Sequence, residues 1–306
     1  MSEPKDSGWK VWLGAARLRT LPLALSGTGM GQYLAFQQGN FDPVICGLTF
    51  LTTLFLQVLS NFANDLGDSL HGADHASRQG PARAVQSGKI STGQMKIAVV
   101  TMAIAALLSG IGLLYVCFRN QPEKALPLFL TGLLAIAAAY FYTNGKKPYG
   151  YMALGDVSVF LFFGFVAVSG SYYLHTLSLS PELILPSCAM GLWSTAVLNI
   201  NNMRDRDSDF SAGKTTLPIV LGPKKALAYH TFLVLGGLFC FLYPLRQNPT
   251  ITFLFLIPGL GLVLRSFVGV LKSREVVQMD QNLKPMALGI FIMVSGLWAI
   301  LYFSKH

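Results

Sequence analysis

Nine apolar segments, each close to the length at which an α-helix crosses a bilayer, dominate this sequence. Hydrophobic residues make up 52% of the chain and charged residues only 12%, about half of the charged share in a soluble domain. A soluble or disordered chain is therefore excluded, and the segments are too long and uniformly apolar for barrel strands. We expect an all-α polytopic membrane protein with one domain over residues 1–306. The segments cover residues 19–37, 43–61, 96–117, 126–143, 154–174, 183–202, 226–244, 250–271 and 286–303.

The first of these segments, 19–37, is the weakest candidate. It is rich in glycine, and the polar residues Ser26, Thr28 and Gln32 interrupt it. The other eight are continuous enough to predict helices from hydropathy alone.

Lysine and arginine residues predict how the helices are oriented. With nine spans, 19 of the 23 Lys and Arg residues fall on the side that carries the N-terminus, and four fall on the other. The positive-inside rule then places the N-terminus in the cytoplasm and the C-terminus outside. We expect an integral protein of the cytoplasmic (inner) membrane. This bias explains the net charge of +9 more simply than a nucleic-acid partner does, and an anionic substrate is the second explanation.

Two long cytoplasmic segments, 62–95 and 203–225, contain a large share of the acidic residues. They hold six of the fourteen Asp and Glu residues, and each cluster begins where an apolar helix ends. Long connections in compact proteins are usually functional or disordered, and these two are not of low complexity, so we expect them to be catalytic loops. The acids are Asp65, Asp68, Asp74, Asp205, Asp207 and Asp209.

The spacing of these acids predicts two stripes of oxygen ligands. If the helices continue, Asp65 and Asp68 share one face, and so do Asp205 and Asp209. Asn61 and Asn201 precede the stripes by one turn, whereas Asp207 lies off the second stripe. Oxygen ligands without His or Cys favour Mg²⁺ or Mn²⁺, and Mg²⁺ is usually shared with substrate phosphates. The alternative is a solvated acidic loop that balances nearby cations.

Basic residues interleaved with these acids favour a diphosphate as the anion. Cations beside metal-binding carboxylates neutralise a leaving diphosphate and so assist cleavage of a carbon–oxygen bond. A single Lys or Arg can equally be a positive-inside residue. We rank Arg78, Lys146 and Lys214 highest as diphosphate ligands.

The two aspartate motifs resemble those of the UbiA superfamily of intramembrane prenyltransferases. The motifs are N-D-x-x-D at Asn64–Asp68 and D-x-x-x-D at Asp205–Asp209. Further strings are similar to the branch of that superfamily that prenylates 1,4-dihydroxy-2-naphthoate in menaquinone synthesis. The resemblance runs from about residue 9 to 225. The strings are Arg17–Ala24, Ser60–Asp65, Gly80–Ala84, Tyr149–Asp156, Asn199–Asp205 and Gly213–Leu217.

This resemblance implies nine helices around a central cavity, capped by the two aspartate loops and the loop of Lys146. It implies Mg²⁺, a membrane-embedded polyprenyl diphosphate and transfer of its prenyl group to 1,4-dihydroxy-2-naphthoate with decarboxylation. The products would be demethylmenaquinone, diphosphate and CO₂. Asp65, Asp68, Asp205 and Asp209 would hold the metal, with Asn61 and Asn64 beside the diphosphate and Lys146 in contact with it. Metal binding by Asp74 is less secure, because it stands further from Asp68 than the third aspartate of the wider superfamily does.

Three further residues are candidates for contact with the substrates, each with a structural alternative. Tyr142 can shield an allylic carbocation through its ring or belong to an interfacial aromatic belt. Asp156 can bind or deprotonate an acceptor hydroxyl, or it can be a carboxylate favoured at a helix N-terminus. Arg19 can hold the acceptor carboxylate or extend to the membrane interface.

Two other functions compete with this prediction. Another aromatic acceptor, such as 4-hydroxybenzoate, would use the same donor chemistry. An ion-coupled transporter would place acids near the middle of its spans and show inverted repeats, whereas here the acids cluster at one face. The length of the prenyl chain cannot be predicted, because it depends on the depth of the cavity.

Overall fold

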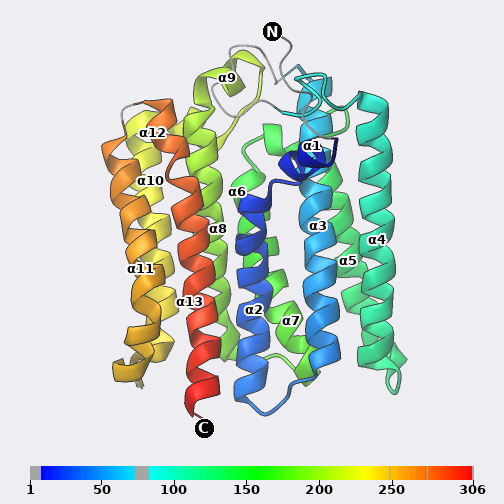
Figure 1. Ribbon diagram of the computed structural model, residues 1–306, viewed down its shortest axis with the longest axis vertical. Helices are drawn as coiled ribbons and strands as arrows, with labels where there is room; N and C mark the ends of the chain where they lie inside the picture. The colour runs from blue at the N-terminus through cyan, green and yellow to red at the C-terminus, as the bar shows by residue number, and fades with distance from the viewer. Residues whose placement is uncertain (1–7, 73–82, 248, 274, 305–306) are drawn as a thin grey trace.

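The computed structural model describes residues 8–72, 83–247, 249–273 and 275–304, and these ranges form a bundle of long helices without a β-strand (Figure 1). The long helices run roughly side by side, and short helices cover one end of the bundle. The helices are α1 (Gly8–Ala15), α2 (Leu21–Gln37), α3 (Pro43–Leu70), α4 (Thr92–Phe118), α5 (Ala125–Phe141), α6 (Gly155–Val159), α7 (Ala167–Thr176), α8 (Ile184–Arg204), α9 (Arg206–Ser211), α10 (Leu217–Leu242), α11 (Pro249–Lys272), α12 (Val276–Asp280) and α13 (Leu283–Ser304).

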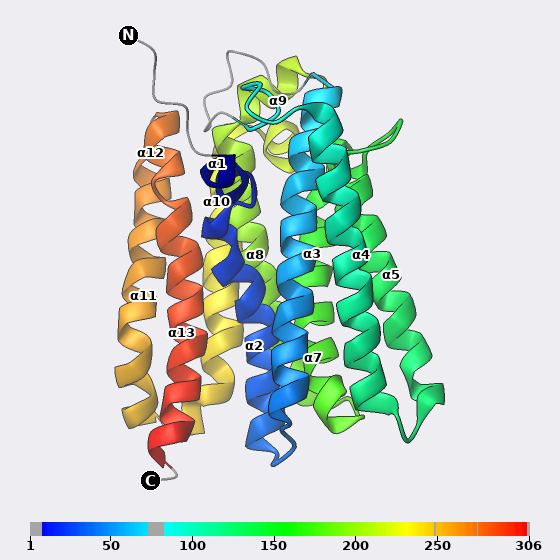
Figure 2. The same cartoon turned by 45° about the vertical axis from the view of Figure 1, so that its right-hand side comes forward.

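Eight of the predicted membrane spans are confirmed as helices that are long and apolar enough to cross a bilayer. The chain is therefore an integral membrane protein. The remaining predicted span, 19–37, forms α2, which has only 17 residues and buries its polar side chains Ser26, Thr28 and Gln32 among its neighbours. Figures 1 and 2 show α2 running between α3 and α13, with α1 at one end of it and α13 alongside it.

Close backbone contacts hold α2 against its neighbours. Gly31 lies so near the carbonyl of Val168 on α7 that a side chain at this position would collide with it. The hydroxyl of Ser171 donates to the carbonyl of Thr28 at 3.0 Å, and Trp298 Nε1 of α13 donates to the carbonyl of Gly29 at 3.1 Å. Small and hydroxyl-bearing residues allow helices to approach in this way inside a membrane, which explains why this segment is poor in bulky apolar residues.

Both motif-bearing helices continue past the ends of their apolar runs. Helix α3 extends to Leu70, and α8 extends to Arg204 and is followed at once by α9. The loop boundaries predicted at 62–95 and 203–225 are therefore too wide, because hydropathy falls where the carboxylates begin while the helical backbone continues. The helix continuation predicted for the stripe of Asp65 and Asp68 is confirmed.

One membrane span, Gly155–Thr176, consists of α6, a seven-residue π-helix (Phe160–Val166) and α7. A carbon at the Cβ position of Gly164 would lie 2.6 Å from the carbonyl oxygen of Ser187, and one at Gly191 would lie 2.7 Å from that of Phe160. Glycines therefore let α8 and the π-helix touch through their backbones. π-Helical turns are often found at functional sites, and this one supplies part of the cavity wall described below.

Gly67 offers a direct test of how the motif end of α3 packs. A Cβ there would lie 2.5 Å from both the carbonyl and the hydroxyl oxygen of Thr143. We expect Gly67→Ala to destabilise the protein by roughly 1–3 kcal/mol, as overpacking does elsewhere. Thermal unfolding of the purified protein in detergent would measure this. The matched control is Gly93→Ala, where no atom lies within 4 Å, and equal melting temperatures for the two variants would contradict the packing.

Candidate active site

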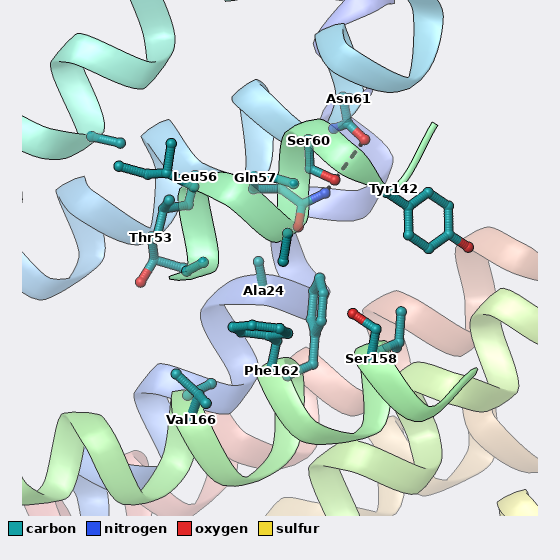
Figure 3. A pocket seen from close by; sticks show the side chains of 18 of the residues that line it. Ala24, Thr53, Leu56, Gln57, Ser60, Asn61, Tyr142, Ser158, Phe162 and Val166 are labelled. Atoms are coloured by element: carbon teal, nitrogen blue, oxygen red, sulfur yellow. Dashed lines mark hydrogen bonds between the residues drawn. The ribbon is translucent and has the colours of Figure 1, made fainter. Parts of the chain in front are cut away.

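A cavity of about 410 Å³ lies inside the bundle and reaches from the aspartate motifs into the membrane-spanning region. Its walls come from α2, α3, α4, α5, α6, the π-helix, α7 and α8. Figure 3 shows Phe162 and Val166 on one side and Thr53 and Leu56 on the other, with Ala24 between them. Most of this wall is apolar, as an isoprenoid chain requires.

Charged and amide side chains gather where the two aspartate motifs face the cavity. They come from the last turns of α3 and α8, from α9 and from the connections that follow α3 and α9. The structure thus brings the two motifs together around one space, at the end of the bundle that α9 covers (Figure 1). The lining residues of this polar end are Asn61, Asn64, Asp68, Arg83, Asn201, Asn202, Arg204, Asp205, Asp209 and Lys214.

Asp68 is held by two partners, of which Arg83 was among the basic residues near the acids in the sequence and Tyr151 was not predicted as a site residue. Arg83 forms an ion pair with its carboxylate, and the hydroxyl of Tyr151 donates to its other oxygen at 2.6 Å. Arg83 also donates to the carbonyl of Asn64 at 2.8 Å. Asp68 is only 2% exposed, so this ion pair is buried, where separating the partners without replacing either would be costly.

Asp65 points away from the cavity in this structure. Its two oxygens accept hydrogen bonds from the backbone N–H groups of Ala84 and Val85 at 3.1 and 3.3 Å. This contact fixes the turn that follows Arg83, so Asp65 helps to set the position of the Arg83 side chain beside Asp68.

The two asparagines of the first motif also make structural bonds. Asn61 Nδ2 donates to the carbonyl of Ala16 at 2.8 Å and to the hydroxyl of Thr20 at 3.1 Å. Gln57, one turn earlier, donates to Asn61 at 3.4 Å (Figure 3). Asn64 Oδ1 accepts from the hydroxyl of Thr143 at 3.3 Å. Both asparagines thereby anchor neighbouring segments while they line the cavity.

The second motif places each of its stripe carboxylates beside a cation. Arg204 Nε and Nη2 donate to the two oxygens of Asp205 at 2.8 and 2.6 Å. Lys214 Nζ lies 3.5 Å from Asp209 and 5.2 Å from the centre of the Tyr151 ring. Tyr151 therefore links the motifs, because it contacts Asp68 of one and Lys214 of the other.

The pKa of Asp209 reflects charges from both motifs. Burial raises the pKa of Asp209 to about 6, with further upward contributions from Asp205 and Asp68, while Lys214 and Arg83 act in the opposite direction. The carboxylates of the two motifs thus repel one another across the polar end, and added positive charge would relieve this repulsion.

The oxygen ligands of the polar end fit Mg²⁺ shared with a diphosphate. Within the described ranges, no three His, Cys, Asp or Glu side chains converge as a complete metal site. Mg²⁺ does not need such a cage, because one or two carboxylates combined with substrate phosphates and water complete its shell. Asp68, Asp205 and Asp209 line the cavity and can serve in this way.

Besides Asp65, three predicted site residues that the structure describes do not line the cavity. Lys146 is exposed and is not among the described residues that line the cavity, and the same holds for Lys147. Asp156 accepts from the hydroxyl of Tyr229 at 3.3 Å behind the cavity wall. Arg19 is paired with Asp280 at 3.5 Å. Arg78, like Asp74, lies outside the residues that the structure describes.

Tyr142, a predicted substrate contact, lines the cavity next to Tyr149, which was not among the predicted site residues. The rings of Tyr142 and Tyr149 meet edge to face with 5.3 Å between their centres, and the hydroxyl of Tyr149 lies 3.0 Å from that of Ser158. Figure 3 shows Tyr142 and Ser158 near each other at one side of the cavity. An aromatic wall therefore continues from the π-helix to the polar end.

Known proteins resemble this chain in sequence and in fold. Residues 24–289 match the UbiA prenyltransferase family. The 1,4-dihydroxy-2-naphthoate octaprenyltransferase of Escherichia coli (strain K12) is 45% identical to this chain, over 78% of each protein. That of Haemophilus influenzae is 46% identical, over 76% of each protein. A solved UbiA homolog from Archaeoglobus fulgidus bound to DMAPP and Mg²⁺ superimposes with a TM-score of 0.61 at 17% identity, covering 93% of this chain and 98% of that one. At this identity the solved structure shows the fold alone.

Proposed function

Because this chain belongs to the UbiA prenyltransferase family, we propose that it transfers a polyprenyl group from a polyprenyl diphosphate to 1,4-dihydroxy-2-naphthoate with loss of CO₂. The observation that carries the proposal is a cavity with an apolar body and a polar end at which both aspartate motifs meet. Such a cavity matches a donor that has a charged head and a long hydrocarbon tail. The acceptor is inferred from the names of the relatives in Escherichia coli and Haemophilus influenzae.

The polar end is the proposed site of the diphosphate. Lys214 and Arg83 line it and carry the positive charge that a diphosphate requires, and Arg83 can bind two phosphate oxygens at once. In this structure both cations pair with aspartates. Entry of the donor would exchange these carboxylates for phosphate oxygens and release Asp68 and Asp209 for a metal.

We propose that Asp68, Asp205 and Asp209 hold Mg²⁺ in the loaded enzyme. When bound, Mg²⁺ neutralises the diphosphate oxygens and so favours departure of diphosphate from the allylic carbon. Asp65, the fourth predicted ligand, can join this set only after its hydrogen bonds to the backbone at Ala84 and Val85 break. Lys146 remains a proposed diphosphate contact, and it would have to turn inward from its exposed position.

The apolar wall protects the reacting carbon. Phe162 and Phe163 of the π-helix, together with Tyr142 and Tyr149, surround the region beyond the polar end. Their rings exclude water and offer negative π faces to an allylic cation. The electron-rich naphthoate ring then forms the new carbon–carbon bond, and the ring carbon that forms it loses its proton. The carboxylate leaves as CO₂, and a proton takes its place on the ring. The product is the reduced form of demethylmenaquinone.

We infer that the polar end faces the cytoplasm. Nineteen of the 23 Lys and Arg residues belong to that side in the predicted topology, and the cations of the site are among them. Soluble naphthoate and Mg²⁺ would then reach the site from the cytoplasm. The enzyme and the tail of the donor would lie in the inner membrane.

Prenyl transfer by the purified protein in lipid nanodiscs tests the proposal. The reaction would contain a polyprenyl diphosphate, Mg²⁺ and either 1,4-dihydroxy-2-naphthoate or 4-hydroxybenzoate, and chromatography with mass detection would identify the products. We expect a prenylated product that has lost CO₂ from the naphthoate only. A product from 4-hydroxybenzoate alone would reject the acceptor while keeping the donor chemistry, and no product from either would reject the proposed function.

A further inference from the structure

Asp280 lies in α12, in the last third of the chain, and reaches toward the second aspartate motif. Its carboxylate forms an ion pair with Arg204 of α8, and Arg19 approaches the same oxygen at 3.5 Å. Asp280 is not among the described residues that line the cavity, whereas Arg204 and Asp205 both are. A connection therefore runs from the outer helix α12 through Arg204 to a proposed metal ligand.

Arg204 is fixed by the carboxylates on both edges of its guanidinium group. Nε and Nη2 bind Asp205, and Nη1 binds Asp280. Arg204 is 5% exposed, so little water competes for its donors. Because the guanidinium is planar and rigid, the position of Asp280 determines the direction from which Arg204 meets Asp205.

The charges around Arg204 have a consequence for metal binding. If Arg204 were paired with Asp205 alone, it would neutralise that carboxylate and weaken the attraction of Asp205 for a metal cation. With Asp280 on its other edge, Arg204 shares its charge between two carboxylates, and the buried group retains negative charge. Asp280 is itself 30% exposed, but it is in direct hydrogen-bond contact with Arg204. Arg19 offsets this charge only in part, because it lies 3.5 Å from Asp280 and its own side chain is 36% exposed, where solvent screens the interaction.

We propose that Asp280 is a positioning residue that keeps the carboxylate of Asp205 available to a divalent cation. The inference rests on the proposed use of Mg²⁺ by the site. Asp280 touches neither substrate nor metal and acts through Arg204. Hydrogen-bond partners of metal ligands commonly change metal affinity by about 10–100-fold, so the effect is large enough to measure directly.

Titration of Mn²⁺ into the purified full-length protein tests this role without relying on turnover. Free Mn²⁺ would be measured by electron paramagnetic resonance in the presence of inorganic diphosphate. We expect Asp280→Asn to weaken Mn²⁺ binding about tenfold, and Asp280→Glu to restore most of the affinity. In the transfer assay, Asp280→Asn should raise the Mg²⁺ concentration for half-maximal rate more than it lowers kcat.

The matched control is Asp207→Asn, which removes the same charge from an exposed carboxylate paired with Arg206. Wild-type Mn²⁺ affinity in a folded Asp280→Asn variant, or an equal loss in Asp207→Asn, would overturn the proposal. If Asp280→Asn does not fold, Arg19→Gln decides, because removing this competing cation should tighten Mn²⁺ binding, and an unchanged or weaker affinity would reject the role.

The two proposals fail in different ways. A wild-type protein that binds Mn²⁺ but does not prenylate the naphthoate would reject the proposed function and leave the comparison of variants valid. Normal transfer with identical Mn²⁺ affinity in the wild type and in Asp280→Asn would reject the role of Asp280 alone.

Discussion

The Asp68→Asn variant is expected to lose prenyl transfer by about 10²-fold or more in kcat/KM, an effect of the size seen when a charge-stabilising group is removed from an active site. Asp68 is 2% exposed and lines the cavity beside Arg83 and Tyr151. Asparagine has nearly the same shape and can still accept the hydrogen bond from Tyr151. The substitution therefore removes the negative charge that a metal needs while largely preserving the packing.

Steady-state kinetics in nanodiscs, combined with thermal unfolding, would separate loss of catalysis from loss of structure. Asp207→Asn serves as the control because its carboxylate is 89% exposed and pairs with Arg206 at the surface. We expect this variant to retain normal turnover. A folded Asp68→Asn protein that retained more than about a tenth of wild-type kcat/KM would contradict a metal-binding role for Asp68.

Hydropathy was sufficient to predict the membrane-spanning helices but not where they end. The predicted segment 43–61 becomes a helix of 28 residues, Pro43–Leu70, because the helical backbone continues through the polar motif. Apolar patterns report contact with lipid or core. Beyond Asn61 only one side of α3 keeps that contact, through Phe62, Ala63 and Leu66, so the mean hydropathy falls although the helix continues. The same reasoning explains α2, whose close contacts with α7 and α13 select small residues and so weaken its hydropathy.

Helical spacing predicted that α3 continues through Asp65 and Asp68, but it did not predict that Asp65 points away from the cavity or which groups hold the acids. Asp68 and Asp205 lie in the polar end as predicted, but the bond from Tyr151 to Asp68 spans 83 positions in the sequence. No periodicity encodes such a contact. Arg83 and Tyr151 did fall within strings that resembled the family, so the resemblance located them without showing their roles.

The basic residues assigned to the substrates were the hardest to place from sequence. Lys146 lies in a basic connection at the correct end of the bundle, yet its side chain is exposed. Arg19 was assigned to the acceptor carboxylate, but in the structure its carboxylate partner is Asp280. A lone basic residue near a site has many possible partners, and only the fold decides among them.

Removal of divalent cations is expected to abolish prenyl transfer completely. Arg83, Arg204 and Lys214 pair with aspartates of the site. When the diphosphate takes over these cations, the released carboxylates would repel it unless a metal binds between them. EDTA should therefore stop product formation, and Mg²⁺ in excess of EDTA should restore it. Mn²⁺ should substitute, since it also prefers oxygen ligands.

Donor binding should depend on the metal in the same way. In a thermal-unfolding assay, a prenyl diphosphate should raise the melting temperature of the wild type only when Mg²⁺ is present, because bound ligand stabilises the folded state. Asp68→Asn should lose this metal-dependent increase, whereas Asp207→Asn should keep it. Full activity in EDTA would contradict this prediction, because the chain's own cations would then suffice for diphosphate departure. The paired carboxylates would in that case serve only to hold Arg83, Arg204 and Lys214 in place.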